Sequence, residues 1–410
     1  MDAKELSPRP SLEQYKKQAK DLVKARKSGD PEALRRIKQH HPRLGKLSDA
    51  ELRSAKFALA DAQFTIAREH HFESWAKFAK HLEALKRKNS AVAQFEAAVE
   101  AVITGGLTTL ERLLRQNPKL IRARSTRKHR ATLLHYVGAN GIEGFRQKTP
   151  KNAVKVAEIL LKAGAEVDAM AEIYGGSTTL GLVATSIHPM RAGVQNALIQ
   201  TLLDYGAGID HPGAAGNGHF VVNGCLANGR GEAAVFLARR GARLDLEGAA
   251  GVGRLDLVKS FFNENGSLKA SATKAQMEAG FAWACEYGRN SVIDFLLKRD
   301  VDLRAQANIG ETGLHWAVVG GQLDTIKLLL ERGAPLEEKN VYGGTALSQA
   351  LWSAINGDPG IDYVPIIETL IEAGAKIEDG SLAWLAQQEG RSSSARARIA
   401  EVLRRHGAKS

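Results

Sequence analysis

The stretch from Thr312 to Ala334 decides the fold, and it reads TGLHWAVVGGQLDTIKLLLERGA. An apolar segment comes first, a Gly-Gly pair interrupts it, and a second apolar segment with three consecutive leucines leads to Gly333-Ala334. Because glycine pairs mark turns between regular elements, the stretch predicts two short helices joined by a tight turn.

The end of this stretch recurs along the chain. An apolar pair followed by a Gly-Ala-like turn is found at nine places from Leu113 to Leu403, and the commonest separation is about 33 to 35 residues. A repeat made of two helices cannot bury its apolar face alone, so such repeats stack into a solenoid with one continuous core. We therefore predict an all-α fold in which residues 89–410 form a repeat array.

The repeats resemble the ankyrin family. Thr312-Gly-Leu-His is similar to the family's T-P-L-H opening, and LLLERGA is similar to its outer helix and Gly-Ala ending; weaker copies of the opening start at Thr132 and Thr345. Residues 95–408 can be laid on this pattern as about eight repeats. The resemblance implies a scaffold that binds another protein through its concave face. It also implies that the opening histidines, His135 and His315, hydrogen-bond the backbone of a neighbouring repeat.

Residues 1–88 read as a separate, basic helical unit. Apolar spacing and capping residues predict four helices, at Ser11–Lys27, Glu32–His40, Asp49–Arg68 and Glu73–Leu85, and the lysines around residues 86–88 mark the boundary. This unit resembles the helical segment that often precedes the repeat array in bacterial ankyrin-repeat proteins, on the strength of AREHHFESW at residues 67–75.

Charge is concentrated in the first third of the chain. Of the formal net charge of +12, residues 1–90 carry +9, residues 91–130 carry +5 and the remainder carries −2. A basic patch can attract an acidic partner, and the stretch RARSTRKHR is the strongest candidate, although a solvated loop is the simpler interpretation. Its cations are Arg122, Arg124, Arg127, Lys128 and Arg130. Aromatic residues do not alternate with the basic ones, so we do not expect nucleic acid binding, which stays an alternative for residues 1–130.

Composition narrows the class of protein further. With 44% hydrophobic residues and 410 residues in all, the chain can bury a large core. Only two cysteines occur, Cys225 and Cys285, so a disulfide scaffold is excluded and a reduced compartment is expected. The sequence contains neither a secretory signal nor an apolar run long enough to cross a bilayer. We predict a cytoplasmic protein without a membrane span.

Three repeats depart from the regular interval between the inner-helix and outer-helix landmarks, which the pair His315 and Leu329 exemplifies. The excess is about 11, 7 and 8 residues, placed near residues 140–150, 187–194 and 354–361. In addition, the inner-helix landmark Glu247 follows Leu237 too closely to leave room for a projecting finger loop, so one finger is missing. These insertions suggest an alternative function, a small-molecule binder or enzyme whose pocket they wall, although neutral loop variation explains them as well.

Candidate binding residues follow from the family resemblance, which places the contact surface at the fingers and just before the glycine of each inner helix. The polar and aromatic residues at those positions are Asn140, Asn228, Glu286, Tyr287 and Trp352. Glu247 and Asn223 occupy the position of the opening histidine, where a carboxylate is hard to explain structurally.

Adjacent histidines and glycine-rich stretches lack metal-ligand, phosphate-loop or nucleophile spacing, so we predict no metal site, no cofactor and no catalytic residues. The sequence does not identify the partner or the oligomeric state.

Overall fold

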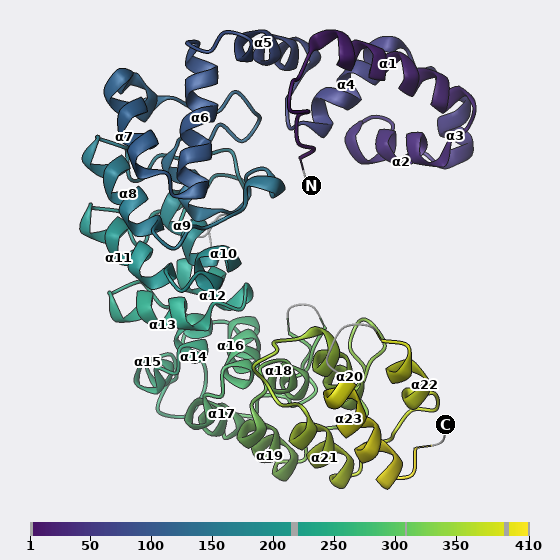
Figure 1. The fold of residues 1–410 in the computed structure, drawn as a ribbon. Helices are drawn as coiled ribbons and strands as arrows, with labels where there is room; N and C mark the ends of the chain where they lie inside the picture. Colours follow the sequence, from purple (N-terminus) through teal and green to yellow (C-terminus); the bar gives the residue numbers. More distant parts are fainter. Residues whose placement is uncertain (1–2, 215–219, 308–309, 389–392, 409–410) are drawn as a thin grey trace. The chain divides into compact units, whose positions relative to one another are not determined.

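A computed structural model describes residues 3–214, 220–307, 310–388 and 393–408. In these ranges the chain is all helical, and extended pairing is limited to three isolated β-bridges. The fold class predicted from the repeats is therefore confirmed. The chain divides into two compact units, residues 1–233 and 234–410. Figure 1 shows the order of the helices.

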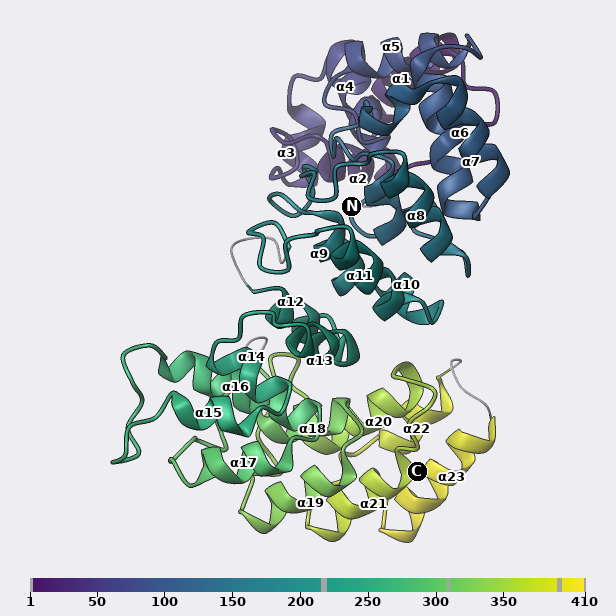
Figure 2. The same ribbon diagram turned by 90° about the vertical axis from the view of Figure 1, so that its left-hand side faces the viewer.

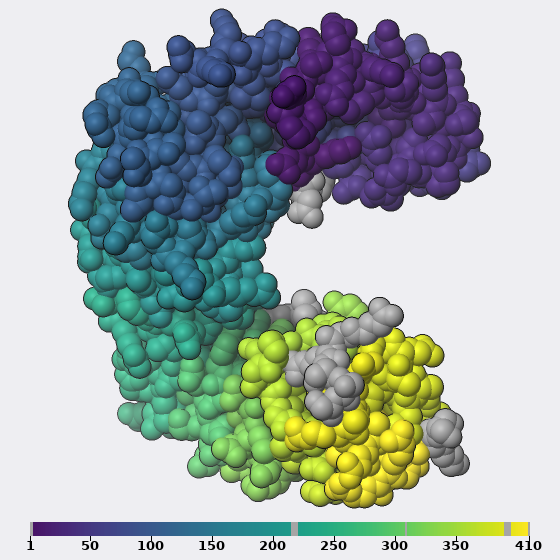
Figure 3. Space-filling view, viewed as in Figure 1, coloured from purple at the N-terminus to yellow at the C-terminus, as the bar shows by residue number. Residues whose placement is uncertain are grey.

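The N-terminal helices form a bundle with its own apolar core, which extends from Tyr15 to Leu82. The helices are α1 (Leu12–Lys27), α2 (Pro31–His40), α3 (Asp49–Ser54), α4 (Leu59–Glu69) and α5 (Trp75–Leu85). Side-chain oxygens of Ser11, Asp30 and Ser74 cap the first turns of α1, α2 and α5, as expected for serine and aspartate at these positions. In the space-filling view, the surface continues from these helices (purple) to the first repeats (blue) (Figure 3).

The single helix predicted over Asp49–Arg68 is wrong, because the chain breaks it between Ser54 and Leu59. Ala55 and Ala58 are extended, and Phe57 in the segment between them is buried. The guanidinium of buried Arg26 donates to the carbonyls of Leu52 and Ala55, so it satisfies the end of α3 in place of a continuing helix. The bundle consequently has five helices in its described residues, one more than predicted.

The rest of the first unit consists of stacked helix pairs. In chain order these elements are α6 (Ala91–Thr104), α7 (Leu107–Gln116), the 3₁₀ turns η1 (Pro118–Arg122), η2 (Leu134–Gly138) and η3 (Gly144–Arg146), α8 (Ala153–Lys162), α9 (Thr179–Thr185), α10 (Ile187–Arg191), α11 (Gln195–Asp204), α12 (Val221–Ala227) and the start of α13 (Gly231–Arg239). The inner element of the repeat that contains His135 is the 3₁₀ turn η2 rather than an α-helix.

The second unit repeats one motif, a short inner helix followed by a short outer helix. Its elements after α13 are α14 (Leu246–Gly251), α15 (Leu255–Ser260), α16 (Lys274–Glu286), α17 (Asn290–Leu297), α18 (Gly313–Val319), α19 (Leu323–Glu331), α20 (Ala346–Asn356), α21 (Val364–Glu372), α22 (Ser381–Ala386) and α23 (Ser393–Arg405). Figure 2 shows the two helix rows side by side. The outer-helix leucines that mark the repeat, Leu296, Leu329 and Leu370, are completely buried between them.

The departures from the regular repeat fall where the intervals predicted them. Residues 240–245 are all that separates α13 from α14, whereas residues 163–178 separate α8 from α9, so the missing finger is confirmed. The insertions are more ordered than loops, since the first contains η3, the second contains α10, and the third lengthens α20 to 11 residues.

Candidate binding surfaces

The first insertion contributes two charged side chains to a buried ionic network. Arg127 Nη1 lies 2.7 Å from Glu96 Oε1 on α6, and Arg127 Nε lies 2.8 Å from Glu143 Oε1 in the insertion. Arg146, also in the insertion, donates to Glu96 Oε2 at 2.6 Å and approaches Glu143 Oε1 at 3.4 Å. The side chain of Glu143 is wholly buried and that of Arg127 is 3% exposed. Two guanidiniums therefore balance two carboxylates inside the protein.

The network shifts the pKa values of its members. Burial alone raises the pKa of Glu96, but attraction from Arg127 and Arg146 outweighs it and brings the value to about 2. Burial likewise opposes ionisation of Glu143, and Arg127 again holds the pKa of that carboxyl well below its usual range. The ring of Phe72, from the N-terminal bundle, lies 5.5 Å from the Arg127 guanidinium. The network therefore ties the bundle, the first repeat and the insertion together.

The residues that follow the other two insertions bond to preceding parts of the chain. At the second, the Gln195 amide donates to the carbonyls of Val183, Ala184 and Ser186 at 2.9 to 3.1 Å, and so it ties α11 to the chain before α10. At the third, the Tyr363 hydroxyl donates to the Val319 carbonyl of the preceding repeat at 3.1 Å. These bonds hold the end of each insertion in place, independently of any ligand.

The basic stretch predicted as a contact surface divides into buried and exposed residues. Arg127 belongs to the buried network, so its inclusion in a surface for a partner is wrong; its charge is already balanced by Glu96 and Glu143. Arg122 is exposed and lies 3.8 Å from Glu166. The remaining cations, Arg124, Lys128 and Arg130, stay accessible to solvent.

Asn140 is half-buried and holds an aromatic residue that the sequence did not single out. Its amide nitrogen donates to Thr185 Oγ1 at 3.0 Å, and its carbonyl oxygen accepts from the Tyr174 hydroxyl at 3.0 Å. Tyr174 is 58% exposed and has a left-handed backbone (φ 49°). A Cβ at Gly141 would meet Ile173 and the Tyr174 ring, so a glycine is needed beneath them. The glycine pair that follows Tyr174 was the only feature of the sequence that indicated a finger tip at this position.

Two further candidate residues of the first unit lie on α12 and at its end. Asn223 is buried, at the inner-helix position that histidine fills elsewhere, and is therefore not part of an exposed surface. Asn228 is exposed, and its amide donates to the Gly224 carbonyl at 2.8 Å. Cys225, between them, is fully buried, and burial raises the pKa of its thiol to about 12, so it has no thiolate at neutral pH.

Glu247 has a structural partner. Its Oε1 accepts a hydrogen bond of 2.8 Å from the indole nitrogen of Trp283 on the neighbouring inner helix α16. Trp283 in turn packs edge-on against Trp316 of α18, with ring centroids 5.1 Å apart. The carboxylate that the sequence left hardest to explain therefore links consecutive repeats.

Glu286 and Tyr287 lie at the end of the inner helix α16, and Trp352 lies within the inner helix α20 of the second unit. Glu286 is 8% exposed, and burial raises the pKa of its carboxyl to about 7. Tyr287 is half-buried, whereas Trp352 is 52% exposed. Sequence reasoning missed the exposed finger tip formed by Val341 and Tyr342, which are 64% and 81% exposed.

The opening histidines are structural. His315 Nδ1 bonds the Thr312 hydroxyl at 2.7 Å, and its Nε2 lies 3.2 Å from the Gly344 carbonyl of the next repeat. This confirms the inter-repeat hydrogen bond implied by the family resemblance for His315. His135 makes the equivalent local contact, since its Nδ1 lies 2.7 Å from the Thr132 hydroxyl.

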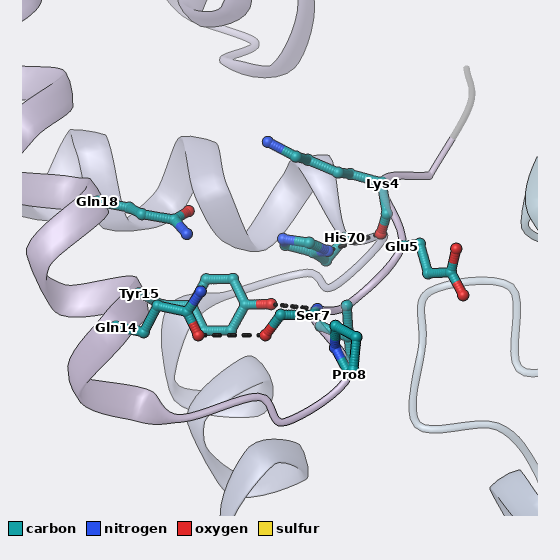
Figure 4. A pocket seen from close by; sticks show the side chains of 9 residues that line it. Lys4, Glu5, Ser7, Pro8, Gln14, Tyr15, Gln18 and His70 are labelled. Atoms are coloured by element: carbon teal, nitrogen blue, oxygen red, sulfur yellow. Dashed lines mark hydrogen bonds between the residues drawn. The ribbon is translucent and has the colours of Figure 1, made fainter.

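Two cavities lie away from the insertions. One, of about 490 Å³, is bordered by α1 and by an N-terminal strap of residues 4–8 (Figure 4). The strap is held by Ser7, whose amide donates to the Tyr15 hydroxyl, and by Lys4, whose carbonyl accepts from His70 Nδ1 at 2.7 Å. The other, of about 610 Å³, is lined by residues 297–304 and 332–335. Neither is bordered by an insertion, so neither matches the pocket that the sequence suggested.

The described residues contain neither a cluster fit for a metal ion nor a helix fit to cross a membrane. No group of three or more histidine, cysteine, aspartate or glutamate side chains is arranged to hold a metal ion in the part of the chain that the structure describes. In the same part, no helix combines the length and the apolar character needed to span a bilayer.

Comparison with known proteins identifies the repeats. The paired helices and finger loops of the second unit define a helical-repeat solenoid. A family model described as ankyrin repeats, in three copies, matches residues 246–339 and 281–380, so this part of the chain contains ankyrin repeats. Repeats of this family generally mediate interactions between proteins. Among solved structures, the human ASB11 ankyrin repeat domain matches with 20% identity and a TM-score of 0.35, over 70% of this chain and 99% of that chain. No curated protein sequence matches the chain.

Proposed function

We propose that the chain is a non-catalytic scaffold that binds a partner protein through the face formed by its inner helices and fingers. The observation that carries this proposal is the exposure of large apolar side chains at that face in the second unit. Trp352 on α20 and Tyr342 on the finger before it are 52% and 81% exposed. Aromatic residues of this kind are the usual centres of protein interfaces.

The finger tip is held in place before any partner binds. Asn340 is buried, and its side-chain oxygen accepts from the amides of Tyr342 and Gly344, both at 3.0 Å. Its amide nitrogen donates to Glu311 Oε1 at 2.9 Å. A prearranged tip loses little conformational entropy on binding, which favours affinity.

Site-specific photo-crosslinking tests this proposal. A photoreactive phenylalanine analogue replaces Trp352 in one variant of the full chain and Lys327, an exposed residue of the outer helix α19, in a matched control. We expect a defined protein adduct from position 352 that is absent from position 327 and is lost when Tyr342→Ala is added. Adducts of equal yield from both positions, or none from position 352, would contradict binding through this face.

A further inference from the structure

The first two fingers of the N-terminal unit form one connected surface, which we call the finger surface (residues 123–131 and 166–178). The Glu172 amide donates to the His129 carbonyl at 2.8 Å, and the Arg124 guanidinium donates to the Met170 carbonyl at 2.5 Å. Within the first finger, the Ser125 amide donates to the Ala131 carbonyl at 2.8 Å. These bonds fix the two fingers relative to each other.

Three cations on this surface are not neutralised by the protein itself. Among the described residues, no carboxylate lies within 4.0 Å of Arg124, Lys128 or Arg130, in contrast to the buried Arg127 nearby. Arg124 also donates to the Arg130 carbonyl at 3.1 Å, and Arg130 donates to the Ser125 carbonyl at 3.3 Å. Both guanidiniums are therefore oriented by backbone carbonyls, while their positive charge is left uncompensated.

An aromatic residue is held on the same surface. Tyr174 stands at the tip of the second finger, 58% exposed, with its hydroxyl bonded to Asn140 and its ring over Gly141. Its left-handed backbone is uncommon for a residue with a large side chain, and such conformations persist where the surroundings hold them. The ring is thus an accessible anchor on the same two-finger surface as the oriented guanidiniums of Arg124 and Arg130.

We propose that the finger surface binds an acidic segment of a partner protein, with carboxylates on Arg124, Lys128 and Arg130 and an apolar side chain on Tyr174. This inference rests on the proposed scaffold function and names the chemistry of one partner segment. The same surface carries the exposed carboxylate of Glu172, which would repel a uniformly anionic polymer such as nucleic acid. A peptide can place a neutral side chain opposite Glu172, whereas a polyphosphate cannot.

The test uses the full chain and a fluorescein-labelled 15-residue peptide of aspartate and glutamate with a central Phe-Leu pair. Fluorescence anisotropy at about 0.15 M salt gives its affinity. A glycine-serine peptide with the same central pair and a 15-nucleotide single-stranded DNA serve as comparison probes. We expect the acidic peptide to bind most tightly. No measurable binding, or tighter binding of the DNA, would overturn the proposal.

Matched variants separate a built surface from general attraction to a basic protein. We expect the double variant Arg124→Gln/Arg130→Gln to bind about tenfold more weakly, with Lys128→Gln and Tyr174→Ala each weakening binding severalfold. The control pair Arg112→Gln/Lys162→Gln removes the same charge from the exposed outer helices α7 and α8. Equal losses in the control pair, or unchanged binding in Lys128→Gln and Tyr174→Ala, would overturn the proposal. Binding of the acidic peptide is measured independently of the Trp352 adduct, so either proposal can fail alone.

Discussion

Glu286 is a buried carboxyl whose environment favours its protonated form. Burial raises its pKa from 4.5 to about 7, and so the folded state binds a proton more tightly than the unfolded state does. The resulting stability is complete below the unfolded pKa and is lost as the pH rises through 7. We predict that Glu286→Gln raises the free energy of unfolding at pH 8, by at most about 3 kcal/mol, and has little effect at pH 4.5. Urea unfolding at the two pH values measures the difference.

A carboxyl on the same helix provides the control. Glu278 lies 3.5 Å from Lys274, and its side chain is 26% exposed, so Glu278→Gln keeps the same change of charge in a more accessible place. This variant should alter the free energy of unfolding by less than about 1 kcal/mol at both pH values. If Glu286→Gln behaved like Glu278→Gln, the carboxyl of Glu286 would be ionised without cost in the folded protein.

The contacts of single residues were harder to predict from the sequence than the helices or the repeat array. Inner-helix spacing placed Trp352 at an exposed position and His315 between repeats, because both positions follow from the repeat itself. Arg127 was misplaced, since its partners Glu96 and Glu143 lie far from it along the chain and nothing local signals that they meet. Tyr174 was missed for the same reason, because its anchor Asn140 lies in another repeat.

At the scale of elements, the buried ionic network holds the first insertion against the first repeat. Glu143 is wholly buried and lies within 3.6 Å of the side chains of Arg127, His129, Tyr136 and Arg146. Removing its charge leaves buried guanidiniums with too little negative charge, which typically costs about 3 to 5 kcal/mol. We predict that Glu143→Gln lowers the free energy of unfolding of the first unit by this amount, measured by urea unfolding with far-UV circular dichroism.

The matched control is Glu158→Gln on α8, the helix that follows the insertion. Glu158 pairs with Lys162 at 3.5 Å, and both side chains are well exposed, so its loss should cost less than about 1 kcal/mol. A similar small effect of Glu143→Gln would show that the network does not hold the insertion against the first repeat.

Elements were predicted best where the repeat period governs them. The number of residues between repeat landmarks, compared with the regular number, located all three insertions and the missing finger. These departures could be predicted because they change only the length of the chain between two landmarks. The break between α3 and α4 was not predicted, since it depends on Arg26 reaching the carbonyls of Leu52 and Ala55 from another helix. The fold of the first insertion likewise depends on Arg146 reaching Glu96 on α6.

At the scale of the whole molecule, the two units respond to acid differently. In the first unit, burial lowers the pKa values of His70, His81 and His135 to about 4. The unfolded chain therefore takes up protons before the folded chain does, so stability present above pH 6.5 is lost between pH 6.5 and 4. In the second unit, the raised pKa values of Glu286 and Glu311 have the opposite sign, and the lowered pKa of His315 offsets part of their effect.

We predict that lowering the pH from 8 to 5 reduces the free energy of unfolding of the first unit, on the order of 2 kcal/mol for each of His70, His81 and His135, and does not reduce that of the second unit. The tryptophans allow the units to be distinguished, because Trp75 alone belongs to the first unit and four belong to the second. The midpoint of urea unfolding followed by tryptophan fluorescence should stay the same or rise, while the midpoint of the far-UV circular dichroism signal, to which both units contribute, should fall. Coincident midpoints at pH 5 would contradict this difference, because they would require both units to lose stability together.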